Sequence, residues 1–200
     1  MTALKRLDFF FFIGSTYTYL SVCRAAKLAE AQGVELVWRP FSVRTLMIEQ
    51  NNIPFATKPR KFAYMWRDIE RRAARFGIPF AGPQKHPVDA KELANHFATV
   101  AAMQGWCVEF TLEVYRGWMI DGKDPGDVEN LAAICGKLGR DFTAVAQLAA
   151  SQEVLDRYAA ETAAARELGI FGSPTYVCGK EIFWGDDRLE DAIDWCRGQG

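Results

Sequence analysis

The sequence predicts an α/β protein whose single sheet is assembled from both ends of the chain, with an all-helical block inserted between them. Strand signals occur in the first 40 residues and return only after residue 173. Between residues 60 and 168, apolar residues recur only with helical spacing. We therefore expect a discontinuous sheet domain of residues 1–46 and 166–200 and an inserted helical domain of residues 47–165.

The N-terminal part has the pattern of a strand, a helix and a second strand. The apolar run Phe9–Gly14 is typical of a buried strand, and apolar residues at three-residue spacing predict a helix over Thr16–Gln32. Val34–Arg39 alternates between apolar and polar residues, as a strand does, before Pro40 ends it. A strand–helix–strand unit of this kind predicts that its two strands are parallel.

Helical spacing marks the middle of the chain throughout. Its apolar stripes run from Phe62 to Phe76, Leu93 to Ala101, Cys107 to Trp118 and Leu131 to Leu138, and shorter helices are expected over Phe142–Ala149 and Ser151–Leu168. The fourth of these helices is expected to open at Asp124-Pro125, with a capping aspartate and a proline at the first helical position.

The C-terminal part has the pattern of a hairpin followed by a helix. Its strands are expected over Pro174–Cys178 and Glu181–Trp184, joined by Gly179-Lys180 with glycine first, as a type II′ turn requires. The last helix is expected from Asp187 to Trp195. These strands complete the sheet that the N-terminal unit begins.

Composition excludes several classes of function. The chain has 200 residues, half of them apolar, and a formal net charge of −1, which gives no reason to expect nucleic acid or an anionic membrane as a partner. Its longest apolar run is too short for a membrane span, and Met1–Asp8 lacks the features of a signal peptide, so we expect a cytoplasmic protein. The five cysteines form no Cys-x-x-Cys pair, and with two histidines no metal site is expected.

The junction between the first strand and the first helix carries Ser15-Thr16-Tyr17-Thr18. One interpretation is that Ser15 caps the helix through its side chain, a routine role for serine. The other is functional, because a dithiol redox enzyme would carry Cys-x-x-Cys at such a junction. This chain has no thiol there, so a reactive sulfur would have to arrive with a ligand.

Two further segments carry candidate residues. Ser173-Pro174 enters the C-terminal hairpin, where proline is either tolerated at a strand start or forms a cis bond that exposes the preceding backbone groups to an extended peptide. Gly185-Asp186-Asp187 opens the last helix, where the carboxylates either complement the helix dipole or bind a ligand ammonium group.

Taken together, these segments resemble the 2-hydroxychromene-2-carboxylate isomerase family, which lies close to the kappa-class glutathione transferases in the DsbA-like thioredoxin superfamily. The resemblance covers essentially the whole chain, and it implies a thioredoxin-like fold interrupted by a helical domain. Its most specific parts are Phe12–Leu20, Asn52-Ile53-Pro54 with Pro59-Arg60-Lys61, Gly169–Thr175 and Phe183–Leu189.

The resemblance implies glutathione as the cofactor, lying across the end of the sheet. Ser15 would hydrogen-bond the glutathione sulfur, and the backbone of Ser173, next to a cis Pro174, would pair with the cysteinyl backbone. The family usually has proline where this chain has Thr16, and we hypothesise that the Thr16 N–H gives the thiolate an additional donor. An aspartate is frequent in the family where this chain has Phe12.

The resemblance also assigns roles to residues farther from the sulfur. Asp186 and Asp187, after Gly185, would hold the γ-glutamyl end, although both also fit a plain helix start. Asn52 and Lys61 would contact the tripeptide or a substrate carboxylate. Turn formation by Asn52 and simple solvent exposure of Lys61 explain these two residues equally well.

The implied reaction is the glutathione-dependent isomerisation of 2-hydroxychromene-2-carboxylate to trans-o-hydroxybenzylidenepyruvate, a step of aromatic hydrocarbon catabolism. Thiolate addition to an enone, rotation and elimination would regenerate the thiol. One alternative is a kappa-type glutathione transferase that releases a conjugate, and a second is a non-catalytic glutathione- or peptide-binding protein. The partners implied are glutathione and a small aromatic carboxylate, together with a second copy of the chain in a homodimer.

Overall fold

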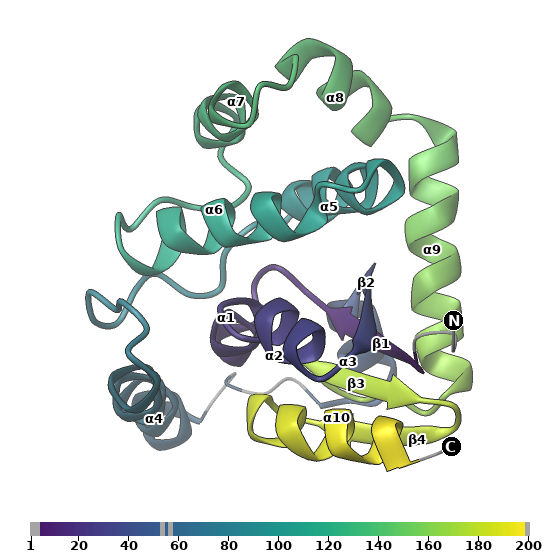
Figure 1. Ribbon diagram of the computed structural model, residues 1–200. Coiled ribbons are helices and arrows are strands. Elements are labelled where there is room, and N and C mark those ends of the chain that lie inside the picture. The colour runs from purple at the N-terminus through teal and green to yellow at the C-terminus, as the bar shows by residue number, and fades with distance from the viewer. Residues whose placement is uncertain (1–4, 53–54, 56–57, 199–200) are drawn as a thin grey trace.

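The computed structural model describes residues 5–52, 55 and 58–198, and it has the α/β architecture that the sequence predicts. Four strands form one mixed sheet in the order β2-β1-β3-β4. Their bounds are β1 Lys5–Phe11, β2 Val34–Pro40, β3 Thr175–Cys178 and β4 Glu181–Trp184. Figure 1 shows the sheet at the centre of the fold, with N-terminal and C-terminal strands side by side.

The register of the sheet determines which loops meet. β1 runs parallel to β2 with Phe9 opposite Trp38, and antiparallel to β3 with Phe9 opposite Tyr176. β3 and β4 form the expected hairpin, and Gly179 has a φ of 63° in its turn. Because β1 and β3 are antiparallel neighbours, the end of β1 lies beside the start of β3.

The two faces of β1 are both buried, which explains its unbroken run of phenylalanines. Phe9 and Phe11 belong to a large apolar cluster that continues through the first helices into the helical block. Phe10 and Phe12 belong to a smaller cluster on the other face. Alternation along the strand therefore divides one apolar run between two cores.

The helices of the block agree closely with the apolar stripes, except that α3 was not expected and that α7 begins later than expected. They are α3 Val43–Glu49, α4 Pro59–Phe76, α5 Leu93–Gln104, α6 Cys107–Met119, α7 Val128–Lys137, α8 Phe142–Ala149 and α9 Gln152–Glu167. The expected start of a helix at Asp124-Pro125 is wrong, because Asp127 occupies the N-cap of α7 and accepts from Glu129 N. Asp124 instead accepts from the backbone N–H groups of Asp89 and Gly126 at 3.0 Å.

A second correction concerns the first helical segment. The expected single helix is two helices, α1 Thr16–Val22 and α2 Ala25–Ala31, separated at Cys23 and Arg24. The Arg24 N–H bonds to the carbonyl of Ser21, three residues back, and its guanidinium stacks 3.7 Å from the Phe76 ring centre. The apolar spacing continues across the break because both helices bury residues in the same core.

The C-terminal segment begins with a single turn of 3₁₀ helix, Asp186–Arg188, and continues as α10, Leu189–Gly198. α10 lies along the sheet beside β4 in Figure 1. None of the helices among the described residues is long and apolar enough to span a bilayer.

Candidate functional site

Ser15 lies where β1 ends and α1 begins, and it directly contacts the start of the C-terminal hairpin. Its backbone occupies the N-cap position with φ −86° and ψ 122°, but its side chain makes no capping hydrogen bond. The interpretation of Ser15 as a side-chain cap is therefore wrong. The Ser15 hydroxyl instead donates to the Ser173 carbonyl at 2.7 Å. The antiparallel pairing of β1 and β3 brings these two residues together across 158 positions of sequence.

Ser173 connects both sides of this junction. The Ser173–Pro174 bond is cis, which confirms one of the two predicted alternatives. The Ser173 hydroxyl accepts from the Phe12 N–H at 2.9 Å and shares a hydrogen bond with the Thr18 hydroxyl at 2.9 Å. The carbonyl of Pro174 accepts from the Gly185 N–H at 3.0 Å. Ser15, Ser173, Pro174 and Gly185 therefore form one continuous hydrogen-bonded unit.

The helical block holds the loop before Ser15 through two buried side chains. Asn95 of α5 accepts from the Ile13 N–H at 2.7 Å and donates to the Ile13 carbonyl at 2.9 Å. The Tyr115 hydroxyl of α6 lies 3.0 Å from the carbonyl oxygens of both Phe12 and Ser15. The sequence did not reveal these contacts, because Asn95 and Tyr115 lie within ordinary apolar helix stripes.

We expect Tyr115→Phe to lower the free energy of unfolding by about 1–3 kcal/mol, because the Ser15 carbonyl loses the hydroxyl donor and the Phe12 carbonyl keeps only the Ser15 N–H. Urea denaturation measures this change. The control is Tyr64→Phe, whose ring is 60% exposed on α4 and whose effect should stay within about 0.5 kcal/mol. Equal stability of the two variants would contradict the assigned role of Tyr115.

The face of α4 that meets α1 carries the next contacts. The Thr16 hydroxyl donates to Met65 Sδ at 3.0 Å, and the Tyr17 hydroxyl donates to Asp68 at 3.1 Å. Lys61 is exposed and lies one helical turn before Met65 on the same face. A one-turn rise is about 5.4 Å, so Lys61 flanks the region beside Thr16 at the start of α1.

The two aspartates after Gly185 have different surroundings. Asp186 is buried, and Arg72 of α4 donates to its carboxylate from Nε at 2.9 Å and Nη2 at 2.7 Å. Burial raises the pKa of Asp186 to about 6, although Arg72 opposes this shift. The side chain of Asp187 is 49% exposed and pairs with Arg188 at 3.2 Å. The structure therefore favours Asp187 over Asp186 as the carboxylate that an incoming ammonium group could reach.

Gly185 provides the backbone conformation that this turn needs. Its φ is 118°, in the region that favours glycine, and a Cβ there would lie 2.5 Å from the Asp187 carboxylate. The Asp187 side chain therefore lies directly over Gly185. This close approach explains the order Gly185-Asp186-Asp187.

Asn52 has a structural role among the described residues. Asn51 has a φ of 51° after α3, and the Asn52 N–H donates to the Met47 carbonyl at 2.8 Å. This is the Schellman turn that ends a helix. No described contact joins Asn52 to Ser15, and Ile53 and Pro54 of the expected motif lie outside the described residues.

The cysteines do not supply a nucleophile at this site. All five are unpaired, and burial raises the pKa of the Cys23 thiol, at the C-terminal end of α1, to about 11. The pKa of the Cys107 and Cys135 thiols is raised by burial as well. A reactive thiol needs a lowered pKa and exposure. The hydroxyl of Ser15 is thus suited to orient a sulfur that a ligand brings.

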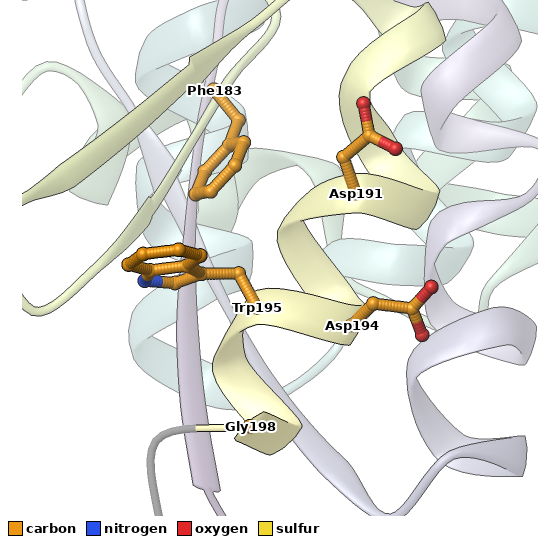
Figure 2. A pocket seen from close by; sticks show the side chains of 5 residues that line it. All are labelled: Phe183, Asp191, Asp194, Trp195 and Gly198. Atoms are coloured by element: carbon orange, nitrogen blue, oxygen red, sulfur yellow. The ribbon is translucent and has the colours of Figure 1, made fainter.

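A separate pocket of about 480 Å³ lies between β4 and α10. Figure 2 shows Phe183 and Trp195 on one side of it and Asp191 and Asp194 along α10. Its carboxylates are already paired, Asp191 with Arg188 at 2.7 Å and Asp194 with Arg197 at 3.7 Å. This pocket contains no residue of the hydrogen-bonded unit around Ser15.

Comparison with known proteins shows that the chain has relatives along nearly its whole length. A family model described as a DSBA-like thioredoxin domain matches residues 6–194. The chain is 30% identical over 186 residues to a 2-hydroxychromene-2-carboxylate isomerase of Pseudomonas sp. (strain C18), covering 92% of this chain and 86% of that protein. It is 26% identical over 208 residues to glutathione S-transferase kappa 1 of Rattus norvegicus, covering 94% and 89%.

A solved structure shows the same likeness in three dimensions. The structure of a 2-hydroxychromene-2-carboxylate isomerase superimposes on this chain with a TM-score of 0.83 and 27% sequence identity. The superposition covers 96% of this chain and 97% of that chain. The likeness therefore includes both the sheet and the inserted helices.

Proposed function

Because the chain belongs to the 2-hydroxychromene-2-carboxylate isomerase family of DsbA-like thioredoxin-fold proteins, we propose that it is a glutathione-dependent isomerase. Its substrate would be 2-hydroxychromene-2-carboxylate and its product trans-o-hydroxybenzylidenepyruvate. The observation that carries the proposal is the Ser15 hydroxyl, which meets the Ser173 carbonyl at a strand–helix junction that has no thiol.

Glutathione binding would exchange one hydrogen bond for two. The Ser15 hydroxyl now donates to the Ser173 carbonyl. When the tripeptide enters, rotation of the Ser15 side chain would direct this donor to the sulfur and leave the carbonyl to accept from the cysteinyl N–H. The Thr16 N–H, at the first turn of α1, has no partner within the helix and would be a second donor to the thiolate. Both donors favour the ionised form of the thiol.

Charged side chains around the site would bind the ammonium group of glutathione and the carboxylate of the substrate. Asp187 is half-exposed beside Gly185 and would bind the γ-glutamyl ammonium group. Lys61 would bind the carboxylate of the substrate. Asn52, at the end of α3, remains a predicted contact of the tripeptide. A homodimer remains part of the proposal, as does a cytoplasmic location, where glutathione stays reduced.

The chemistry follows from a bound thiolate. The thiolate adds to the double bond of the ring-opened enone, forming a C–S bond while the π electrons move to the carbonyl oxygen as an enolate. The former double bond is now single and rotates. Collapse of the enolate then breaks the C–S bond and returns the thiolate, so that glutathione is regenerated.

Three measurements on the wild-type protein test this proposal directly. Isothermal titration calorimetry should show binding of reduced glutathione, and thiolate absorbance should rise on binding because the thiol pKa falls. Chromene carboxylate should then be isomerised only when glutathione is present. Absence of glutathione binding would remove the mechanism entirely.

A kappa-type transferase is the second candidate, favoured by the likeness to the rat glutathione S-transferase kappa 1. The two activities differ in the fate of the sulfur. With the chromene substrate we expect the concentration of free glutathione to be unchanged after many turnovers, measured by thiol titration. Accumulation of a stable conjugate, identified by mass spectrometry, would instead establish transfer.

A further inference from the structure

His86 is an imidazole that the sequence left without a role, and the structure places it beside the loop that carries Ser15. Its ring stacks on Trp118 with centres 6.3 Å apart and planes 15° apart. It also meets the rings of Phe55 at 5.6 Å and Phe62 at 5.9 Å. Trp118 stacks in turn on Tyr115 with ring centres 5.9 Å apart, and the Tyr115 hydroxyl lies 3.0 Å from the Ser15 carbonyl oxygen. An aromatic cluster thus positions one titratable ring next to the site.

The segment that carries His86 is held by other groups. Trp118 Nε1 donates to the Lys85 carbonyl at 3.1 Å. Arg44 donates to the carbonyls of Val88 and Asp89, both at 3.1 Å. These bonds anchor the residues on both sides of His86 without using its imidazole. A phenylalanine would supply the same ring contacts, so the packing alone does not require an imidazole at this position.

The surroundings of His86 favour the neutral imidazole. Burial lowers the pKa of His86 below its ordinary value of 6.5, the Gly14 backbone opposes this shift, and the positive charge of Arg44 on α3 adds to it. The rings from α4, α6 and Phe55 carry no charge, and the neighbouring Lys85 is paired with Asp124 at 3.3 Å. A neutral imidazole can accept a proton at one position and donate it at another.

We propose that His86 is the acid–base residue that opens the substrate ring, an inference that rests on the proposed isomerase function. The substrate is a cyclic hemiketal, and the thiolate can add only to its open enone form. His86 would take the proton of the hemiketal hydroxyl as C2=O forms, and the C2–O1 bond would break toward the ring oxygen. The proton then passes from His86 to that oxygen, giving a phenol. No atom or electron is gained or lost, as an isomerisation requires.

The test compares the chromene with a related substrate that needs no ring opening. The second substrate is cis-o-methoxybenzylidenepyruvate, whose methyl ether cannot close into a hemiketal but still needs thiolate addition. We expect His86→Gln and His86→Phe to lower kcat/KM for the chromene by about 10²-fold, the usual contribution of general acid–base catalysis. For the methoxy compound, both variants should stay within about twofold of wild type, since no general acid–base step is removed.

A pH profile separates this role from a packing role. In wild type, the ratio of kcat/KM for the chromene to that for the methoxy compound should rise with pH through a pKa below 6.5, as His86 loses its proton. The ratio should be independent of pH in both variants. The control is His96→Gln, which changes the half-buried histidine of α5 that contacts Tyr158 at 5.1 Å, and its ratio should follow wild type.

The outcomes distinguish a failure of the proposed isomerase function from a failure of the role assigned to His86. If wild type isomerises neither compound, the proposed function itself is wrong, and the role of His86 falls with it. If wild type isomerises both and the His86 variants lose both equally, His86 only supports packing. Unchanged turnover of the chromene by His86→Gln would likewise overturn the inference. Glutathione calorimetry on each variant shows whether the site is still folded.

Discussion

Ser15→Ala is expected to raise the pKa of the thiol of bound glutathione and to slow isomerisation by about 10²-fold, as loss of a single donor to a developing anion does in other enzymes. The reason is that Ser15 provides the hydroxyl that would turn from the Ser173 carbonyl to the sulfur. The affinity for glutathione should fall by a smaller factor than the rate of isomerisation, because the backbone contacts of the tripeptide do not involve the hydroxyl. Calorimetry and thiolate absorbance measured across pH separate these two effects.

The matched control for this variant is Ser21→Ala, which removes a buried hydroxyl farther along the same helix. We expect its thiol pKa and its turnover to equal those of wild type. The prediction fails if Ser15→Ala retains the wild-type thiol pKa. In that case, the thiolate would be stabilised by backbone groups alone, and Ser15 would serve only to join the two loops.

The largest expected effect on stability comes from Arg72→Met. This change removes the ion-pair partner of Asp186, whose side chain is 4% exposed, and leaves a buried carboxylate with only the more distant charge of Arg24. Removing one member of a buried ion pair costs about 3 kcal/mol or more. The control is Arg75→Met on the same helix, where the arginine is exposed and the change should stay within about 0.5 kcal/mol.

The pH dependence of Arg72→Met follows from the raised pKa of Asp186. Folding favours the protonated carboxyl, since its pKa is about 6 in the fold against 3.8 for an unperturbed aspartate. Its contribution to stability is therefore fully present below 3.8 and is lost as pH rises through about 6. Without Arg72, the pKa rises further. The free energy of unfolding of the variant should therefore fall further below that of wild type as pH rises from about 5 to about 8. Urea denaturation at several pH values measures this difference. A difference in unfolding free energy that does not change with pH would contradict this account.

The sequence was a good guide wherever periodicity alone decides the structure. The stripes from Phe62 to Phe76 and from Cys107 to Trp118 correspond to α4 and α6. It was a poor guide at helix boundaries, where one hydrogen bond decides the outcome. Asp124 and Asp127 are both good caps, but Asp124 is used by the backbone of Asp89, so the helix begins at the second aspartate.

The candidate site was predicted in part. Ser15, Ser173 and Gly185 each stand at the end of a predicted strand, and an antiparallel sheet brings such ends together. Ser15 bonds directly to Ser173, and Gly185 bonds to the adjacent Pro174, so these residues lie together, while Asn52 makes no described contact there. The groups from the helical block were missed. In the sequence, Tyr115 and Asn95 lie within the apolar faces of their helices. Periodicity shows which side of a helix is buried, but it does not show which groups that side contacts.

By itself, the sequence determined most of the helices, the strands and their pairing within each terminal unit, and a serine in place of a thiol at the end of β1. These features depend on local spacing and on residue type. The tertiary structure alone decided that Arg72 pairs with Asp186, that Asp187 stays half-exposed, and that His86 stacks on Trp118. The physical reason is that burial and pairing of polar groups depend on contacts between distant helices, which no local pattern records.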